Sequence, residues 1–186
     1  MSGLYSQTGQ RKYVTREEGV WLLREAKRSS VADYALCSVL LHTGCRISEA
    51  LALKHDLIDI DMGGLWFRTL KRRCADPVWR LVPVPSDVIT ALSPLSCTAD
   101  GKLFEWSRAT AWRHVCRLMR QVGMEGAYAS PKGLRHRFGV VAVCEGVPIS
   151  LLQRWMGHAK LENTLIYLQA MGPEERRFAD RLRVTI

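Results

Sequence analysis

Helical spacing of apolar residues along most of the chain is the feature that most restricts the fold. Between residues 15 and 53, and again from Ser86 onward, apolar side chains recur every three or four positions, a pattern typical of helices with one buried face. Two runs, residues 65–70 and 78–83, are strand-like, and a third strand is predicted near residues 57–60. The sequence therefore predicts a mainly α fold with a small antiparallel β-sheet (α+β).

Capping residues indicate where several helices begin. Thr15 and Glu18 have the spacing of a capping box, which predicts the start of the first long helix. Ser30, Ser86 and Ser107 are predicted N-caps because serine side chains accept hydrogen bonds from free N–H groups of the first turn. Further helices are expected over residues 46–53, 109–122, 132–144, 149–156, 161–169 and 173–182.

The length and the distribution of polar residues suggest a single domain. The chain has 186 residues, enough to bury a sizeable core. Residues 1–14 are polar and contain glycine, so we predict a loose, flexible arm there. Residues 15–186 are then expected to form one domain, with no separate N-terminal domain.

A strong positive charge favours a polyanionic partner. The chain has 27 Lys and Arg against 18 Asp and Glu, a net charge of +9, which suits nucleic acid. Candidate DNA contacts are Arg113, Arg117 and Arg120 on one predicted helix, and Arg72 and Arg73 between the two strands. No apolar run approaches the ~18 residues of a membrane span, and the N-terminus lacks a signal-like apolar region. A cytoplasmic protein without membrane contact is expected.

Four residues far apart in the sequence could together cleave a phosphodiester: Arg46, Arg135, His158 and Tyr167. Arginine forks bind two phosphate oxygens and stay charged, and a histidine can hydrogen-bond a third. A tyrosine hydroxyl can attack phosphorus when its ionisation is assisted. Because preorganised charge is usually the largest catalytic contribution, this set predicts DNA strand cleavage through tyrosine without a metal or nucleotide cofactor.

Five segments match, in order, the boxes of one known family. Residues 43–49 resemble its first-arginine box, residues 69–71 and 80–84 its β-hairpin lysine and following strand, and residues 130–136 its His-x-Leu-Arg-His box. Residues 152–158 resemble its Leu-Gly-His box, and residues 163–167 its nucleophile helix. On these segments the chain resembles the catalytic domain of a tyrosine recombinase of the phage integrase type, and the resemblance implies that domain's fold.

The resemblance also implies a role for each residue. Arg46 and Arg135 would clamp the scissile phosphate, and His158 would hydrogen-bond one of its oxygens. Tyr167 would attack and hold a 3′-phosphotyrosyl link. Lys71, at the tip of the hairpin, would protonate the leaving 5′ hydroxyl as general acid.

Three neighbours of these residues complete the predicted site. Lys132 stands where the family usually has a histidine, and we count it among the catalytic candidates, although a lysine is a poor general base at neutral pH. Glu49 lies one helical turn after Arg46 and is expected to orient an arginine. His136 is expected to be structural.

The function implied is a site-specific recombinase that cleaves and rejoins DNA during integration, excision, inversion or resolution of a mobile element or plasmid. Expected partners are double-stranded DNA, further copies of the chain in a homo-tetramer on paired sites, and a host DNA-bending protein, in a prokaryotic cytoplasm and associated with the nucleoid. With about 14 residues before the catalytic part, the chain either resembles small single-domain members such as the fimbrial phase-variation invertases or is a truncated catalytic domain.

Two alternatives remain open. A type IB topoisomerase shares the active-site plan but relaxes DNA without pairing sites. A catalytically impaired DNA-binding regulator or accessory factor would keep the basic surface without a reactive tyrosine. Lys132, and the expected lack of the N-terminal domain with which most family members clamp DNA, suggest this alternative. A metal nuclease is disfavoured because no carboxylate cluster lies beside the basic boxes.

Overall fold

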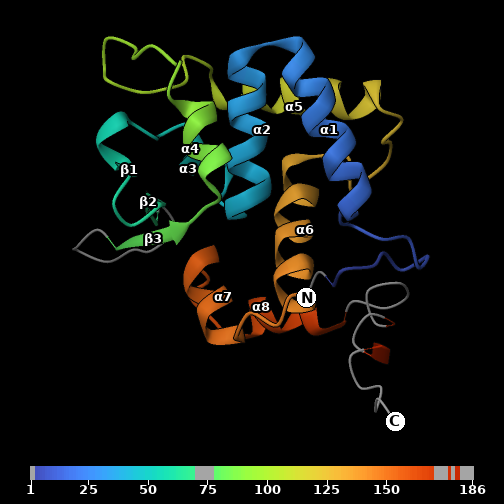
Figure 1. The fold of residues 1–186 in the computed structure, drawn as a ribbon. Helices are drawn as coiled ribbons and strands as arrows, with labels where there is room; N and C mark the ends of the chain where they lie inside the picture. The colour runs from blue at the N-terminus through green and yellow to red at the C-terminus, as the bar shows by residue number, and fades with distance from the viewer. Residues whose placement is uncertain (1–2, 70–77, 170–175, 177–178, 181–186) are drawn as a thin grey trace.

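The structure, a computed structural model, describes residues 3–69, 78–169, 176, 179 and 180. Lys71, Arg72 and Arg73, and most of the helix predicted over residues 173–182, lie outside the described residues. The elements run in the order α1 (Arg16–Ser29), α2 (Val31–Thr43), α3 (Ile47–Ala50), η1 (His55–Leu57), β1 (Ile58–Asp59), β2 (Gly64–Arg68), β3 (Trp79–Pro83), α4 (Ser86–Leu92), α5 (Arg108–Gln121), α6 (Pro131–Cys144), α7 (Ile149–Met156), α8 (Glu162–Leu165) and η2 (Ile166–Gln169) (Figure 1).

The predicted sheet is confirmed, including its third strand. The strands are antiparallel in the order β1-β2-β3, with Ile58 opposite Leu65 and Phe67 opposite Arg80. Leu65 and Phe67 on β2 are buried, and so are Arg80 and Val82 on β3, as the period-two alternation of a half-buried sheet requires. Arg80 is therefore an arginine at a core-facing strand position.

Most predicted helix starts are confirmed. Thr15 and Glu18 form a reciprocal capping box, and Ser30 and Ser107 accept hydrogen bonds from N–H groups of α2 and α5. The N-cap prediction at Ser86 is wrong: Pro85 occupies the cap position, and Ser86 is the first helical residue.

Two predicted helices are less regular than expected. The helix predicted over residues 46–53 is a single turn, since α3 spans only Ile47–Ala50 and a turn follows. The helix predicted over residues 161–169 divides into α8 and the 3₁₀ turn η2, which carries Tyr167.

The prediction of a loose arm at residues 1–14 is wrong for the residues described. Leu4, Tyr13 and Val14 are buried, and Tyr5 pairs with Arg11 in an isolated β-bridge. The guanidinium of Arg11 forms an ion pair with Glu18 of α1. The polar composition suggested an arm, but three apolar side chains and this ion pair hold the segment on the domain.

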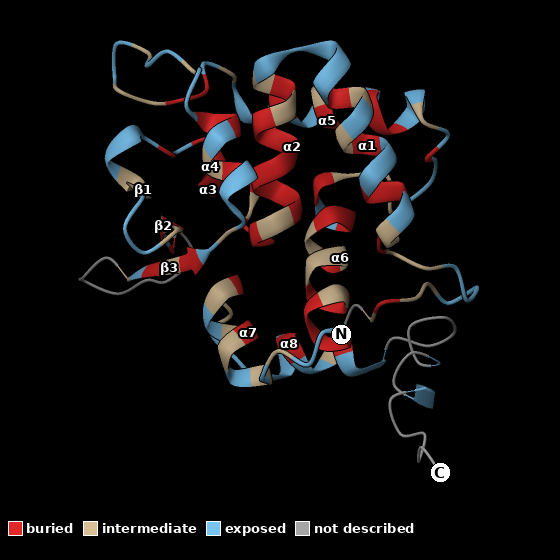
Figure 2. Ribbon diagram, in the orientation of Figure 1, coloured by how far each residue is buried: buried red, intermediate tan, exposed pale blue. Residues whose placement is uncertain are grey.

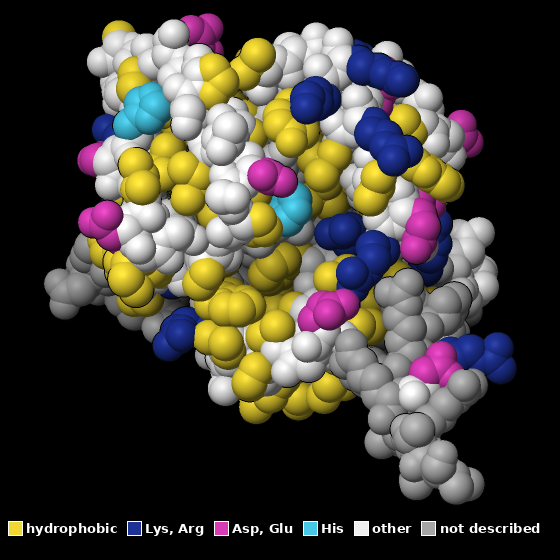
Figure 3. Space-filling model, viewed as in Figure 1, with side chains coloured by type: hydrophobic (Ala, Val, Ile, Leu, Met, Phe, Trp, Pro, Cys, Tyr) yellow, Lys and Arg dark blue, Asp and Glu magenta, His cyan; other side chains and the backbone are white. Residues whose placement is uncertain are grey.

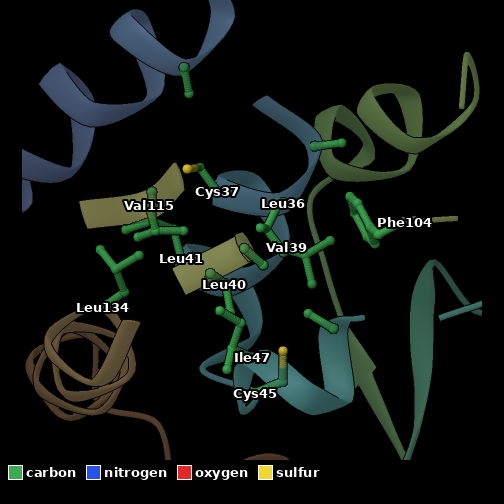
Figure 4. Packing of buried hydrophobic residues seen from close by; sticks show 14 of the residues in the cluster. Leu36, Cys37, Val39, Leu40, Leu41, Cys45, Ile47, Phe104, Val115 and Leu134 are labelled. Carbon is green, nitrogen blue, oxygen red and sulfur yellow. The ribbon is translucent and has the colours of Figure 1, made fainter. Parts of the chain in front are cut away.

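The core consists of two hydrophobic clusters joined by α6. The larger cluster surrounds α2, which packs against α1, α4 and α6. Figure 4 shows part of this cluster, including Leu36, Leu40 and Val115. The smaller cluster lies between the second half of α6, α7 and η2. Figure 2 shows buried residues along the whole of α6, which runs from the α1–α2 layer to α7 and α8.

Charge and apolar character are unevenly distributed on the surface. In Figure 3, Lys and Arg side chains gather over and below α1, whereas hydrophobic side chains dominate around α7 and α8. Within the described residues, no helix combines the length and apolar character needed to cross a bilayer.

Candidate active site

A pocket of about 450 Å³ lies where the start of α3, the first half of α6, the turn after α7 and η2 meet. Five of the predicted catalytic residues line it: Arg46, Lys132, Arg135, His158 and Tyr167. They come from segments up to 121 positions apart in the chain (167 − 46). The fold therefore assembles the predicted set, apart from Lys71, which the structure does not describe.

Arg135 is fixed by two backbone carbonyls. Its Nη1 donates to the carbonyl of Gly44, where α2 ends, at 2.6 Å, and its Nη2 donates to the carbonyl of Met156, at the end of α7, at 2.8 Å. Burial and the nearby charge of Arg46 lower the pKa of Arg135 to about 10, so the guanidinium remains charged at neutral pH. A cation held this rigidly is suited to binding an anion in the pocket.

Arg46 is held by Glu49, the residue predicted to orient an arginine. Arg46 Nη1 lies 2.9 Å from Glu49 Oε1, and the backbone N–H of Arg46 donates to Glu49 Oε2 at 2.8 Å. The side chain of Glu49 is completely buried. Although burial alone would raise its pKa, Arg80 and Arg46 outweigh it and hold the pKa below its usual range, so Glu49 is ionised.

Arg80 is a site residue that the sequence interpretation missed. Its Nη2 lies 2.7 Å from Glu49 Oε2, its Nε donates to the Trp155 carbonyl at 2.8 Å, and its Nη1 donates to Thr69 Oγ1 at 3.1 Å. It thus ties β3 to α3 and α7. The available signal was the alternation of β3, which places an arginine among inward-facing residues.

Gly157 makes room for Arg80 and ends α7. It has a positive φ of 63°, a conformation that favours glycine, and a Cβ there would lie 3.0 Å from the Arg80 guanidinium. The next residue, His158, is directed towards the pocket by this turn.

His158 is neutral and is held in place through its Nδ1. Its Nδ1 lies 2.9 Å from Oγ1 of the buried Thr164, which leaves Nε2 for a ligand in the pocket. Burial, followed by the charges of Arg135 and Arg46, lowers the pKa of His158 to about 3. A neutral imidazole with Nδ1 accepting from threonine carries its proton on Nε2, where it can donate to a phosphate oxygen.

Tyr167 lies deep against α6 and is only 1% exposed. A Cβ on Gly139 would lie 2.5 Å from its ring, so the absence of a side chain at Gly139 lets the ring approach the helix. The ring of His158 stacks at 6.4 Å between centroids, and that of His136 lies at 5.9 Å. Burial raises the pKa of Tyr167 to about 12, although Arg135 and Arg46 oppose the increase.

The predicted DNA contacts on α5 have different local partners. Arg117 forms an ion pair with the buried Asp33 at 3.1 Å, so part of its charge is used within the domain. Arg113 donates to Thr110 and Arg120 to the carbonyl of Cys116, at 3.3 Å each. All three arginines are exposed.

We expect acid to destabilise the protein because His136 is buried in its neutral form. Burial and the charges of Lys132, Arg135 and Lys12 lower its pKa from 6.5 to about 4, so between these values the unfolded chain binds more protons and stability rises with pH. Lowering the pH from 7 to 5 should reduce the free energy of unfolding by about 2 kcal/mol because of His136. Urea unfolding at both pH values measures the loss, and His136→Gln should reduce it. The exposed His55, changed to Gln as a control, should leave it unchanged; equal losses in all three proteins would contradict the assignment.

A helical domain that brings two arginines, a histidine and a tyrosine into one pocket is the arrangement expected of a tyrosine recombinase catalytic domain. The sequence profile of the Phage integrase family matches residues 12–172. The chain belongs to the phage integrase family.

Individual relatives agree with this membership. Tyrosine recombinase XerA of Thermococcus kodakarensis is 31% identical over 182 residues, which cover 93% of this chain and 63% of that protein. The crystal structure of XerA recombinase matches with a TM-score of 0.79 at 24% identity, over 94% of this chain and 66% of that one. XerH recombinase bound to its difH substrate matches with a TM-score of 0.76 at 20% identity, over 98% of this chain and 56% of that one.

These comparisons confirm the predicted fold, that of a tyrosine recombinase catalytic domain. The chain spans about three fifths of the length of the first curated relatives it matches, 63% and 61%.

Proposed function

We propose that this chain is the catalytic part of a site-specific DNA recombinase that cleaves and rejoins DNA through a 3′-phosphotyrosyl intermediate. The observation that carries the proposal is the convergence of Arg46, Arg135, His158 and Tyr167 on one pocket. Relatives of this chain bear the name tyrosine recombinase. The excess positive charge of the chain suits double-stranded DNA.

In the proposed reaction, the scissile phosphate enters the pocket and is bound by Arg46 and Arg135, while His158 donates Nε2–H to one of its oxygens. The Tyr167 hydroxyl attacks phosphorus, and the 5′ oxygen leaves with a proton. Lys71 is the proposed donor of that proton, and Lys132, exposed at the rim of the pocket, is a proposed phosphate contact. Attack by a 5′ hydroxyl of a partner strand reverses the chemistry and rejoins the DNA.

Burial of Tyr167 adds a requirement to this scheme. A ring that is 1% exposed has to shift towards the pocket for its hydroxyl to reach a phosphate. Because η2 packs against α6 and α8, such a shift has to change those contacts.

The proposed assembly is a homo-tetramer on two paired DNA sites, with a host bending protein as a further partner. Leu161, the N-cap of α8, Leu165 in α8 and Leu168 in η2 are exposed at positions i, i+4 and i+7. An exposed apolar stripe of this kind favours protein contact. We propose a cytoplasmic, nucleoid-associated location and a single catalytic domain, on which the N-terminal segment packs. The proposed DNA contacts are Arg72, Arg73, Arg113, Arg117 and Arg120.

The test of the proposal is covalent trapping on nicked DNA. A supercoiled plasmid that carries the native locus separates the rivals: recombinant products support the proposal, and relaxation of plasmids without the locus supports a topoisomerase. Binding without any adduct supports a DNA-binding regulator.

A further inference from the structure

His136 lines the pocket, and its ring nitrogens have no assigned task in the reaction described above. It is only 7% exposed, yet it lines the same pocket as Arg135 and Tyr167. Both of its ring nitrogens are buried, and neither has a hydrogen-bond partner within the described part of the chain. Leaving a buried polar atom without a hydrogen bond is unfavourable, so such a group in a pocket points to a partner that arrives with the substrate or during the reaction.

The side chains of His136 on α6 and Tyr167 on η2 lie next to each other. Lys132, Arg135, His136 and Gly139 occupy positions i, i+3, i+4 and i+7 and therefore share one face of α6. The Tyr167 ring packs on Gly139, and its centroid lies 5.9 Å from that of His136. Among the described residues, the Tyr167 hydroxyl makes no hydrogen bond either. Two neighbouring groups, one with a proton to lose and one with a free lone pair, are thus both unpaired.

We propose that His136 accepts the hydroxyl proton of Tyr167 when that hydroxyl attacks the DNA phosphate. The assignment rests on the proposed function. The bond between Tyr167 Oη and phosphorus forms as the bond to the leaving 5′ oxygen breaks. The phenol proton moves to the free imidazole nitrogen of His136, and the leaving oxygen takes its proton from a separate acid. On rejoining, His136 returns the proton to Tyr167.

The other candidates for this role are less suitable. Lys132, in the place of the family's usual histidine, is exposed, and an ammonium group offers no acceptor lone pair. His158 uses Nδ1 with Thr164 and is placed to donate Nε2–H to the phosphate.

The charges around His136 explain how it can serve as a base. The titratable groups that face it are Lys132 and Arg135 on α6, Lys12 in the N-terminal segment, His158 after α7 and Tyr167 on η2. Its lowered pKa keeps it neutral, so a lone pair is available. A bound phosphodiester adds negative charge among the same cations, which favours the imidazolium form at the moment of transfer.

The pH profile of adduct formation tests the proposal. The probe is a nicked duplex selected by the protein from random-sequence duplexes, with the covalent adduct measured from pH 6 to 9. We expect a nearly flat profile for the unaltered protein. His136→Gln should be about 10²–10⁴-fold slower, with a rate that rises about tenfold per pH unit because Tyr167 must ionise unaided. Lys132→Gln, the matched control on the same face, should be slower but should keep the flat profile.

Chemical rescue provides a second readout that a structural role would not affect. His136→Ala opens space beside Tyr167, and added imidazole should restore a large part of the lost rate, with thermal unfolding confirming that the variant is folded. If the pH profile of His136→Gln runs parallel to that of the unaltered protein, and imidazole does not rescue His136→Ala, His136 is not the base. That outcome leaves the proposed function untouched. Failure of the unaltered protein to form any adduct would instead contradict the proposed function, and the assignment with it.

Discussion

Arg135→Lys is expected to slow covalent adduct formation by about 10²–10³-fold, the cost typical of removing one preorganised donor to a transition state. Lysine keeps the positive charge but not the planar fork. Arg135 spans the carbonyls of Gly44 and Met156, and a single ammonium group cannot hold both and also present a donor to phosphate. The rate of adduct formation on a nicked duplex, at saturating protein, is the measurement.

The control is Arg24→Lys, an equivalent change at an exposed position of α1. It should leave the rate within about twofold. DNA affinity should fall only modestly in Arg135→Lys, because most affinity comes from the summed phosphate contacts. Equal adduct rates in both variants would show that Arg135 takes no part in binding the transition state.

Glu49→Ala is expected to have the largest effect on stability, a loss of about 3–5 kcal/mol, because it removes one partner of a buried ion pair. The side chain of Arg80 is 3% exposed and lies 2.7 Å from Glu49, so the substitution leaves a buried guanidinium without its counter-ion. Arg46 loses the same carboxylate. Urea unfolding at neutral pH measures the loss, and adduct formation should fall as well.

The matched control is Glu145→Ala, which breaks the exposed ion pair between Glu145 and Arg16. Exposed pairs contribute about 0–1 kcal/mol, so the two variants should differ by several kcal/mol. Glu49→Gln, which retains volume and an acceptor, should lie between them. If Glu49→Ala were as stable as Glu145→Ala, the Arg46–Glu49–Arg80 network would not hold the site together.

Much of the site could be predicted because its chemistry restricts residue types strongly. The structure brings Arg46, Arg135, His158 and Tyr167, which the sequence selected by residue type and family spacing, into one pocket, and their catalytic roles stay predictions. The mainly α fold with a small sheet followed from helical spacing, capping residues and two strand-like runs. These are local signals, and a single sequence carries them directly.

What the sequence did not reveal depends on tertiary contacts. In the sequence Arg80 is one of many basic residues. Only the folded structure shows that its guanidinium donates to Glu49 and to the Trp155 carbonyl. The polarity of the N-terminal segment predicts a loose arm, but Leu4 and Tyr13 are buried in the smaller cluster. From the sequence alone His136 is expected to be structural. That its ring nitrogens are buried without a partner can be seen only in the folded structure.

The central claim is that Tyr167 forms a covalent bond to DNA, and covalent trapping tests it most directly. The protein and Tyr167→Phe are each incubated with nicked duplex from the native locus, and the products are separated under denaturing conditions. The account predicts a protein–DNA adduct for the unaltered protein and none for Tyr167→Phe, although both bind the duplex. An adduct of equal yield with Tyr167→Phe, or no adduct from an unaltered protein that binds the duplex, would contradict it.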